Sequence, residues 1–67
     1  MKRAKLLSYL NDQGCILVRE GAKHTVVVNP IKKLVTTVPR HNDINEHLVD
    51  KICKDVGITS FRKRPRN

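Results

Sequence analysis

The first regular pattern of apolar positions lies near the start of the chain. Leu6, Leu7 and Leu10 fall on one stripe of a helix with 3.6 residues per turn. Gly14 follows the stripe, and glycine readily adopts the left-handed conformation that ends many helices. The pattern therefore predicts a helix over about residues 2–13.

A second helical pattern lies toward the other end of the chain, with apolar residues at spacings of three, four and seven. These residues are Leu48, Val49, Ile52, Cys53 and Val56. Asn45 precedes them and suits the N-cap, because its short side chain accepts a hydrogen bond from the first turn. Gly57 follows as a stop signal. We expect a second helix over residues 45–56.

Between these segments the pattern changes to three short β-type stretches separated by turn residues. Residues 15–20 are apolar and then charged, and residues 25–29 are rich in β-branched side chains, with Gly21 in the turn between them. After a basic loop, residues 34–38 resume the β pattern, and Pro39 ends it. The sequence thus predicts three strands.

This order predicts an α+β fold of αβββα type, with a three-stranded antiparallel sheet and both helices on one face. The other face of the sheet would stay open to solvent or to a partner. Alternation along the second strand puts His24 and Val26 on one side and Thr25 and Val27 on the other. Because both sets contain valine, the pattern leaves open which side faces the core.

Charge narrows the choice of partner. The 67 residues include 14 Lys and Arg against 6 Asp and Glu, a net charge of +8 at pH 7, which favours a polyanion such as nucleic acid. We expect one domain over residues 1–59 and a mobile basic tail over residues 60–67. No apolar run approaches the roughly 20 residues that span a bilayer, so a cytoplasmic protein without a membrane anchor is expected.

The patterns that bind nucleotide cofactors or metal ions are missing. The three glycines are far apart and do not form a phosphate-binding loop. The cysteines and histidines form neither a CxxC nor an HExxH motif. We therefore predict no cofactor and no metal site, and we expect Cys15 and Cys53 to be buried thiols that do not form a disulfide.

His24 stands where the glycine turn becomes the second strand. RNA can be cleaved by few catalytic groups, because its 2′-hydroxyl is an internal nucleophile. The reaction then needs only one general acid or base and nearby cations. Histidine, with an ordinary pKa of about 6.5, suits this task, and Lys23 would contact the phosphate. The same pair also fits a plain solvated strand end, which composition alone favours. His41, in a loop, and His47, in the second helix, are weaker candidates.

The segments GCILVREGAKHTVVVNP and TTVPRHNDINEHLVDKICKDVGI resemble the HicA family of bacterial toxin components, and the likeness runs from Lys2 to Ile58. It implies a fold similar to the double-stranded-RNA-binding domain, ribosome-independent mRNA cleavage and neutralisation by a cognate HicB antitoxin. In that family one histidine after a glycine turn carries catalysis, and its match here is His24. Many members have Gly-Ser-His at this point, whereas Ala22 and Lys23 separate Gly21 from His24 in this chain.

The leading hypothesis is a metal-independent endoribonuclease toxin with His24 as its catalytic residue. The candidate RNA contacts are Lys23, Arg19, Lys32, Lys33 and Arg40. Water or Lys23 would serve as a second proton-transfer group, since neither His41 nor His47 carries over from the family. Two alternatives stay open: a non-catalytic small RNA-binding domain, and a basic domain that only holds an acidic partner. The scarcity of aromatic residues argues against recognition of single strands by base stacking.

Overall fold

The order of helices and strands matches the sequence-based prediction. In the computed structural model, which describes residues 1–60, the elements are α1 (Arg3–Asp12), β1 (Ile16–Glu20), β2 (His24–Asn29), β3 (Leu34–Pro39) and α2 (Glu46–Asp55). The αβββα prediction is confirmed, with β2 beginning one residue earlier than expected and β3 ending one residue later. Of the expected tail, residues 61–67 lie outside the described residues.

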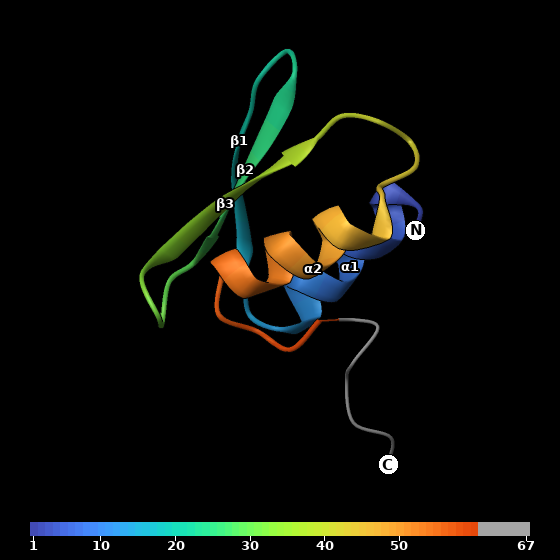
Figure 1. The fold of residues 1–67 in the computed structure, drawn as a ribbon. Helices are drawn as coiled ribbons and strands as arrows, with labels where there is room; N and C mark the ends of the chain where they lie inside the picture. Colours follow the sequence, from blue (N-terminus) through green and yellow to red (C-terminus); the bar gives the residue numbers. More distant parts are fainter. Residues whose placement is uncertain (61–67) are drawn as a thin grey trace.

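The strands form one antiparallel sheet in the order β1-β2-β3, with β2 in the centre. β2 pairs with β3 without interruption, from His24 opposite Pro39 to Asn29 opposite Leu34. The pairing of β1 with β2 shifts by one residue at Val18, which is a β-bulge. Both helices lie on the same side of this sheet (Figure 1), so one face of it stays uncovered by the described chain.

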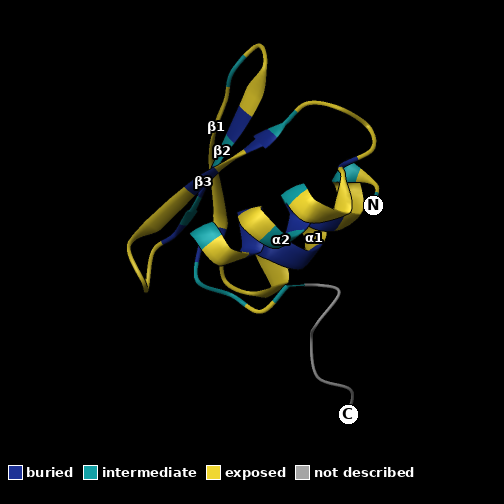
Figure 2. Ribbon diagram, viewed as in Figure 1, coloured by how far each residue is buried: buried dark blue, intermediate teal, exposed yellow. Residues whose placement is uncertain are grey.

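Alternation along β2 decides which of its side chains face the helices. Thr25, Val27 and Asn29 are buried, with 0, 2 and 4% of their surface exposed. His24 is exposed, and the two valines on its side of the strand are only half-buried. Figure 2 shows the same alternation in colour. The sequence pattern did not decide which side of β2 faces the core. The structure shows that His24 lies on the open face, away from the helices.

The core lies between the helices and the covered face of the sheet. Its fully buried aliphatic side chains include Leu6, Leu10, Val27, Val38, Val49 and Ile52. Burying one such side chain stabilises a fold by about 1.5–3 kcal/mol. Cys15 and Cys53 are buried thiols that do not form a disulfide, as predicted. Burial raises the pKa of the Cys15 thiol, and Cys53 beside it raises that pKa further. Within residues 1–60, neither helix has the length and apolar character that a membrane crossing requires.

The helix ends follow the predicted signals. The side-chain oxygen of Asn45 accepts a hydrogen bond of 2.8 Å from the backbone N–H of His47, which confirms Asn45 as the N-cap of α2. Gly14 and Gly57 follow the two helices with φ values of +90° and +71°, in the left-handed region that glycine tolerates best.

One side chain ties α1 to the end of the sheet that carries His24. Arg3 Nε donates to the carbonyl oxygen of Pro39 at 3.1 Å, and its Nη2 donates to Thr25 Oγ1. The same Nη2 lies 3.4 Å from Glu20 Oε1. These partners come from β3, β2 and β1, and two of them adjoin His24: Thr25 follows it in sequence and Pro39 pairs with it. A single guanidinium thus joins all three strands around the histidine.

The first residues of the chain also fix the loop between β3 and α2. Arg3 N donates to Asn42 O at 2.8 Å, and Ile44 N donates to Met1 O at 2.7 Å. The amino group of Met1 returns a hydrogen bond of 3.1 Å to Ile44 O. Because Ile44 is itself buried in the core, the segment that carries His41 has a defined course without regular secondary structure.

The alternation along the sheet can be tested with two isosteric substitutions. Val27 is 2% exposed on the covered face, whereas Val35 is 57% exposed on the open face. We expect Val27→Thr to lower the free energy of unfolding by about 1–3 kcal/mol, because it buries a hydroxyl group in the core. Val35→Thr should change it by less than about 0.5 kcal/mol. Urea denaturation measures both, and equal losses would show that the helices do not cover the face assigned to them.

The Arg3 contacts predict that Arg3 contributes more to the free energy of unfolding than its neighbour Lys2. Arg3→Gln should lower the free energy of unfolding by about 1–3 kcal/mol, because it leaves partly buried acceptors without their donor. Lys2→Gln removes the same charge from an ion pair with Asp43 whose side chains are 71% and 70% exposed, so its cost should stay below about 1 kcal/mol. Thermal and urea unfolding of both variants test this, and an equal cost would remove the structural role assigned to Arg3.

Candidate active site

His24 and His41 line the same hollow on the surface. The hollow has a volume of about 350 Å³, and its lining residues are Ala22, Lys23, His24, Pro39, Arg40 and His41. They come from the turn between β1 and β2, the first residue of β2, the last residue of β3 and the two residues after it. Two segments that are distant in the sequence therefore form one site.

Strand pairing brings these two segments together. His24 lies opposite Pro39, and Arg40 N donates to Lys23 O at 3.3 Å, one step beyond the end of the strands. The chain after Pro39 consequently runs beside the turn before His24. From the sequence alone, His41 is a weaker candidate than His24 because it lies in a loop. The pairing register would have placed it beside His24, but that register is known only from the fold.

The turn before His24 is held closed from two sides. Gly21 N donates to His24 O at 2.8 Å, and a Cβ atom on Gly21 would lie only 3.3 Å from that same oxygen. Arg40 Nη1 donates to Gly21 O at 3.1 Å and lies 3.9 Å from Glu20 Oε1. Arg40, expected only as an RNA contact, therefore also fixes the turn that presents the histidine.

The charges around the hollow are mainly positive. Lys23 and Arg40 line it. Arg19 pairs with Val26 and so projects from the open face, because cross-strand partners in a sheet share a face. The nearby carboxylate of Glu20 is paired with Arg3 and Arg40. A phosphodiester entering the hollow would thus meet cations on both of its walls.

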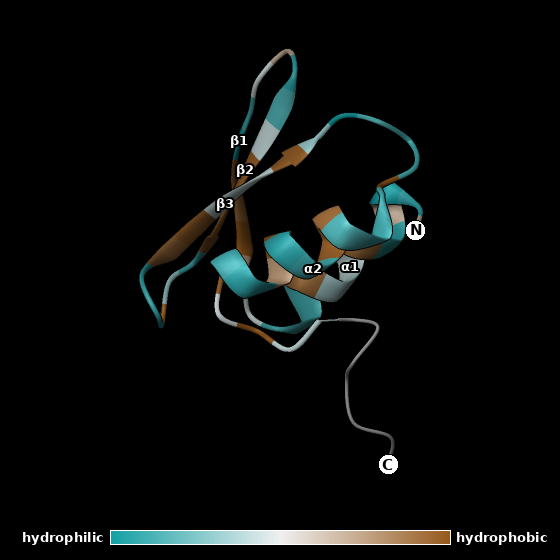
Figure 3. Cartoon of the chain, viewed as in Figure 1, coloured by the Kyte–Doolittle hydropathy of each residue, from teal (hydrophilic) through white to brown (hydrophobic). Residues whose placement is uncertain are grey.

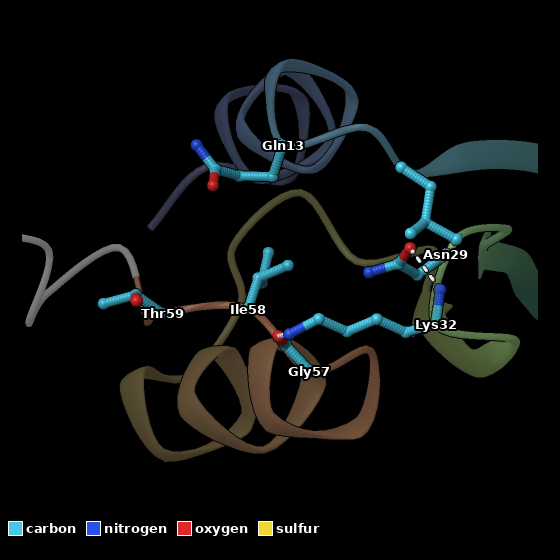
Figure 4. Close-up of a pocket in the computed structure, with 7 residues that line it drawn as sticks. Gln13, Asn29, Lys32, Gly57, Ile58 and Thr59 are labelled. Carbon is cyan, nitrogen blue, oxygen red and sulfur yellow. Dashed lines mark hydrogen bonds between the residues drawn. The ribbon is translucent and has the colours of Figure 1, made fainter.

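Lys32 and Lys33 do not share this hollow. They lie in the loop between β2 and β3, at the opposite end of β2 from His24, which a rise of about 3.3 Å per residue places roughly 17 Å away. Lys32 extends along the end of α2 and donates from Nζ to Gly57 O, and its backbone N donates to Asn29 Oδ1 at 3.3 Å (Figure 4). Its cation thus stabilises the C-terminal end of a helix dipole.

Part of the open face is apolar, near the end of β2 that lies away from His24. Ile16, Val28 and Val35 pair in one row across the three strands, and Ile16 and Val35 are 52% and 57% exposed. The first half of β3 is brown, hence hydrophobic, in Figure 3 and yellow, hence exposed, in Figure 2. We call Ile16, Val28 and Val35 the apolar row. Exposed aliphatic groups that gather on one face are typical of a protein interaction site.

Among residues 1–60, no three side chains of His, Cys, Asp or Glu gather closely enough to hold a metal ion.

Comparison with known proteins identifies the family. A family model described as HicA toxin of bacterial toxin–antitoxin matches residues 3–58. This span includes both helices, all three strands and every residue that lines the hollow. No curated protein and no solved structure matches the chain. Because the matched residues cover nearly all of the chain, the protein belongs to the HicA family of toxins from bacterial toxin–antitoxin pairs.

Proposed function

We propose that this toxin is a metal-independent endoribonuclease that cleaves mRNA, with His24 as a catalytic residue and residues 1–59 as the catalytic domain. Family membership implies the toxin role and a cognate antitoxin. The observation that supports the activity is an exposed imidazole in a hollow lined by Lys23 and Arg40 on the open face of the sheet.

The chemistry of RNA fits a site of this kind. The 2′-hydroxyl lies next to the phosphate that it attacks, so the protein need not supply a nucleophile. An imidazole in the hollow can exchange a proton with a reacting oxygen. The ammonium of Lys23 and the guanidinium of Arg40 would stabilise the negative charge that grows on the phosphate oxygens. Each required role thus has a residue among those that line the hollow.

The basic residues divide into two groups along the proposed path of RNA. Lys23, Arg40 and Arg19 would contact the phosphates beside the cleaved bond. Lys32 and Lys33, at the other end of β2, would reach only an RNA that extends along the sheet by several nucleotides. Phosphate contacts of this type position a strand without selecting its sequence.

Replacing the imidazole tests the proposed activity. His24→Ala should reduce the rate of RNA cleavage by about 10²- to 10⁴-fold, the usual effect of losing a proton-transfer group. The free energy of unfolding should change by less than about 0.5 kcal/mol, because the side chain is exposed. Cleavage of labelled mRNA and urea denaturation of the same preparations measure the two effects.

Lys23→Ala provides the contrast, since it removes a proposed phosphate contact and keeps the imidazole. It should weaken RNA binding and slow cleavage without abolishing it. If His24→Ala cuts at the parental rate, the histidine is an ordinary surface residue. If the parental chain shifts RNA in a gel but never shortens it, the protein is an RNA-binding domain without catalysis.

We propose further that the antitoxin covers the open face, from the apolar row to the hollow. A partner that is seated on Ile16, Val28 and Val35 and extends along the open face to His24 would keep RNA away from the imidazole. The net charge of +8 favours a partner with acidic groups opposite the hollow. Inhibition would then come from direct occlusion of the imidazole.

A pair of charge substitutions tests this arrangement. In a His24→Ala background, Val35→Asp should weaken binding of the cognate antitoxin at least about tenfold, because it puts a carboxylate into the apolar row. Asn11→Asp makes the same change of charge at an exposed position on α1 and should leave the affinity unchanged. Titration calorimetry gives both affinities. If Asn11→Asp weakens binding and Val35→Asp does not, the antitoxin binds on the helical side, and direct occlusion of His24 is excluded.

A further inference from the structure

We infer that His41 is the second proton-transfer group of this site. His24 and His41 would each carry out one of the two proton transfers in RNA cleavage. The inference rests on the proposed ribonuclease activity. It assigns a role that neither the family match nor the sequence pattern gives to His41.

The geometry supports a shared site. Both histidines are exposed, and both line the hollow of about 350 Å³. His24 stands on the wall formed by the turn and β2, and His41 stands on the wall formed by the chain after β3. The hydrogen bond from Arg40 N to Lys23 O holds these walls side by side. A phosphodiester placed between them would have an imidazole on each side.

The loop that carries His41 is anchored on its other side as well. Asn42 O accepts a hydrogen bond of 2.8 Å from Arg3 N, and Ile44 is bound through its N–H and carbonyl oxygen to Met1. Arg3 also holds Pro39 and Thr25, which flank His24 in the sheet. The same N-terminal segment therefore positions both imidazoles, which is what a site built from two proton carriers requires.

The other side chains of the hollow do not suit the second proton transfer. Ala22 and Pro39 have no titratable group. Arginine remains charged in proteins, and Arg40 already binds Gly21 O. The ammonium of Lys23 is a good partner for phosphate charge, but lysine gives up a proton near neutrality only when its pKa is strongly lowered. Imidazole is the side chain that both accepts and donates a proton near pH 7, and His41 supplies the second one.

The reaction then balances with two imidazoles and no further reactant. One neutral imidazole takes the proton from the 2′-hydroxyl as the bond between that oxygen and phosphorus forms. The other, as imidazolium, gives its proton to the 5′-oxygen as the bond between phosphorus and that oxygen breaks. The products are a 2′,3′-cyclic phosphate and a 5′-hydroxyl end. The two histidines finish the step with their protonation states exchanged.

A sulfur-substituted RNA tests this division of roles. The probe is a short RNA that carries the bond cut by the parental chain, with sulfur in place of the bridging 5′-oxygen of that bond. A thiolate leaves without protonation far more readily than an alkoxide, because thiols are much stronger acids than alcohols. The substitution therefore removes the need for a general acid and keeps the need for a general base.

On normal RNA, His41→Ala and His41→Asn should each slow cleavage by about 10²- to 10⁴-fold, as His24→Ala does. On the sulfur-substituted RNA, only one of the two alanine variants, His24→Ala or His41→Ala, should regain nearly the parental rate, and that variant is the one that lacks the acid. Recovery of the rate also shows that the rescued variant is folded. His47→Ala serves as the matched control, because His47 is an exposed histidine on α2 and does not line the hollow; both of its rates should be parental.

Two results would overturn the inference and leave the proposed function intact. The first is parental cleavage by His41→Ala on normal RNA while His24→Ala is inactive. The second is slow cleavage by both alanine variants on both substrates, which would show that neither histidine is the acid. If the parental chain itself fails to cut RNA, the proposed function fails, and the role of His41 falls with it.

Discussion

The burial of Thr25, Val27 and Asn29 against the two helices is the constraint on which the rest of the structure depends. Once these side chains face the core, the intervening residues of β2 must face the other way. A shift of the β2 register by one residue would bury the imidazole of His24 and expose Val27. Polar contacts support this register at both ends of β2, because Thr25 accepts from Arg3 and Asn29 Nδ2 donates to Val56 O at 2.8 Å.

This register also forms the candidate active site, which is a surface hollow and not a deep cavity. The antiparallel pairing of β2 with β3 places the chain after Pro39 beside the turn before His24. Both segments end the regular sheet, where side chains reach solvent and the backbone is still held by hydrogen bonds. In a domain of this size, which buries only about 60% of its unfolded surface, such a rim is the available place for an accessible proton-transfer group. Arg3 and Arg40 hold its backbone in place through hydrogen bonds to Pro39 O and Gly21 O.

How much the sequence predicts depends on whether the signal is local. The element order, the Asn45 cap and the buried thiols were predicted correctly, because each depends on neighbouring residues. The face to which His24 belongs could not be predicted, because Val26 and Val27 are chemically alike and only the position of the helices separates them. His41 was ranked low because its place beside His24 depends on strand register. The hydrogen bond from the Lys32 ammonium to Gly57 O could not be predicted either, because it joins the loop after β2 to the end of α2.

In the proposed reaction, an imidazole on the open face promotes attack by the 2′-hydroxyl of RNA. The most direct measurement is the identity of the new RNA ends, determined by mass spectrometry after incubation of the full chain with mRNA in the presence of a chelator. We expect 2′,3′-cyclic phosphate, or the 3′-phosphate formed by its hydrolysis, together with 5′-hydroxyl ends. Ends that carry 3′-hydroxyl and 5′-phosphate groups would contradict it, because they arise when water attacks and the 2′-hydroxyl takes no part.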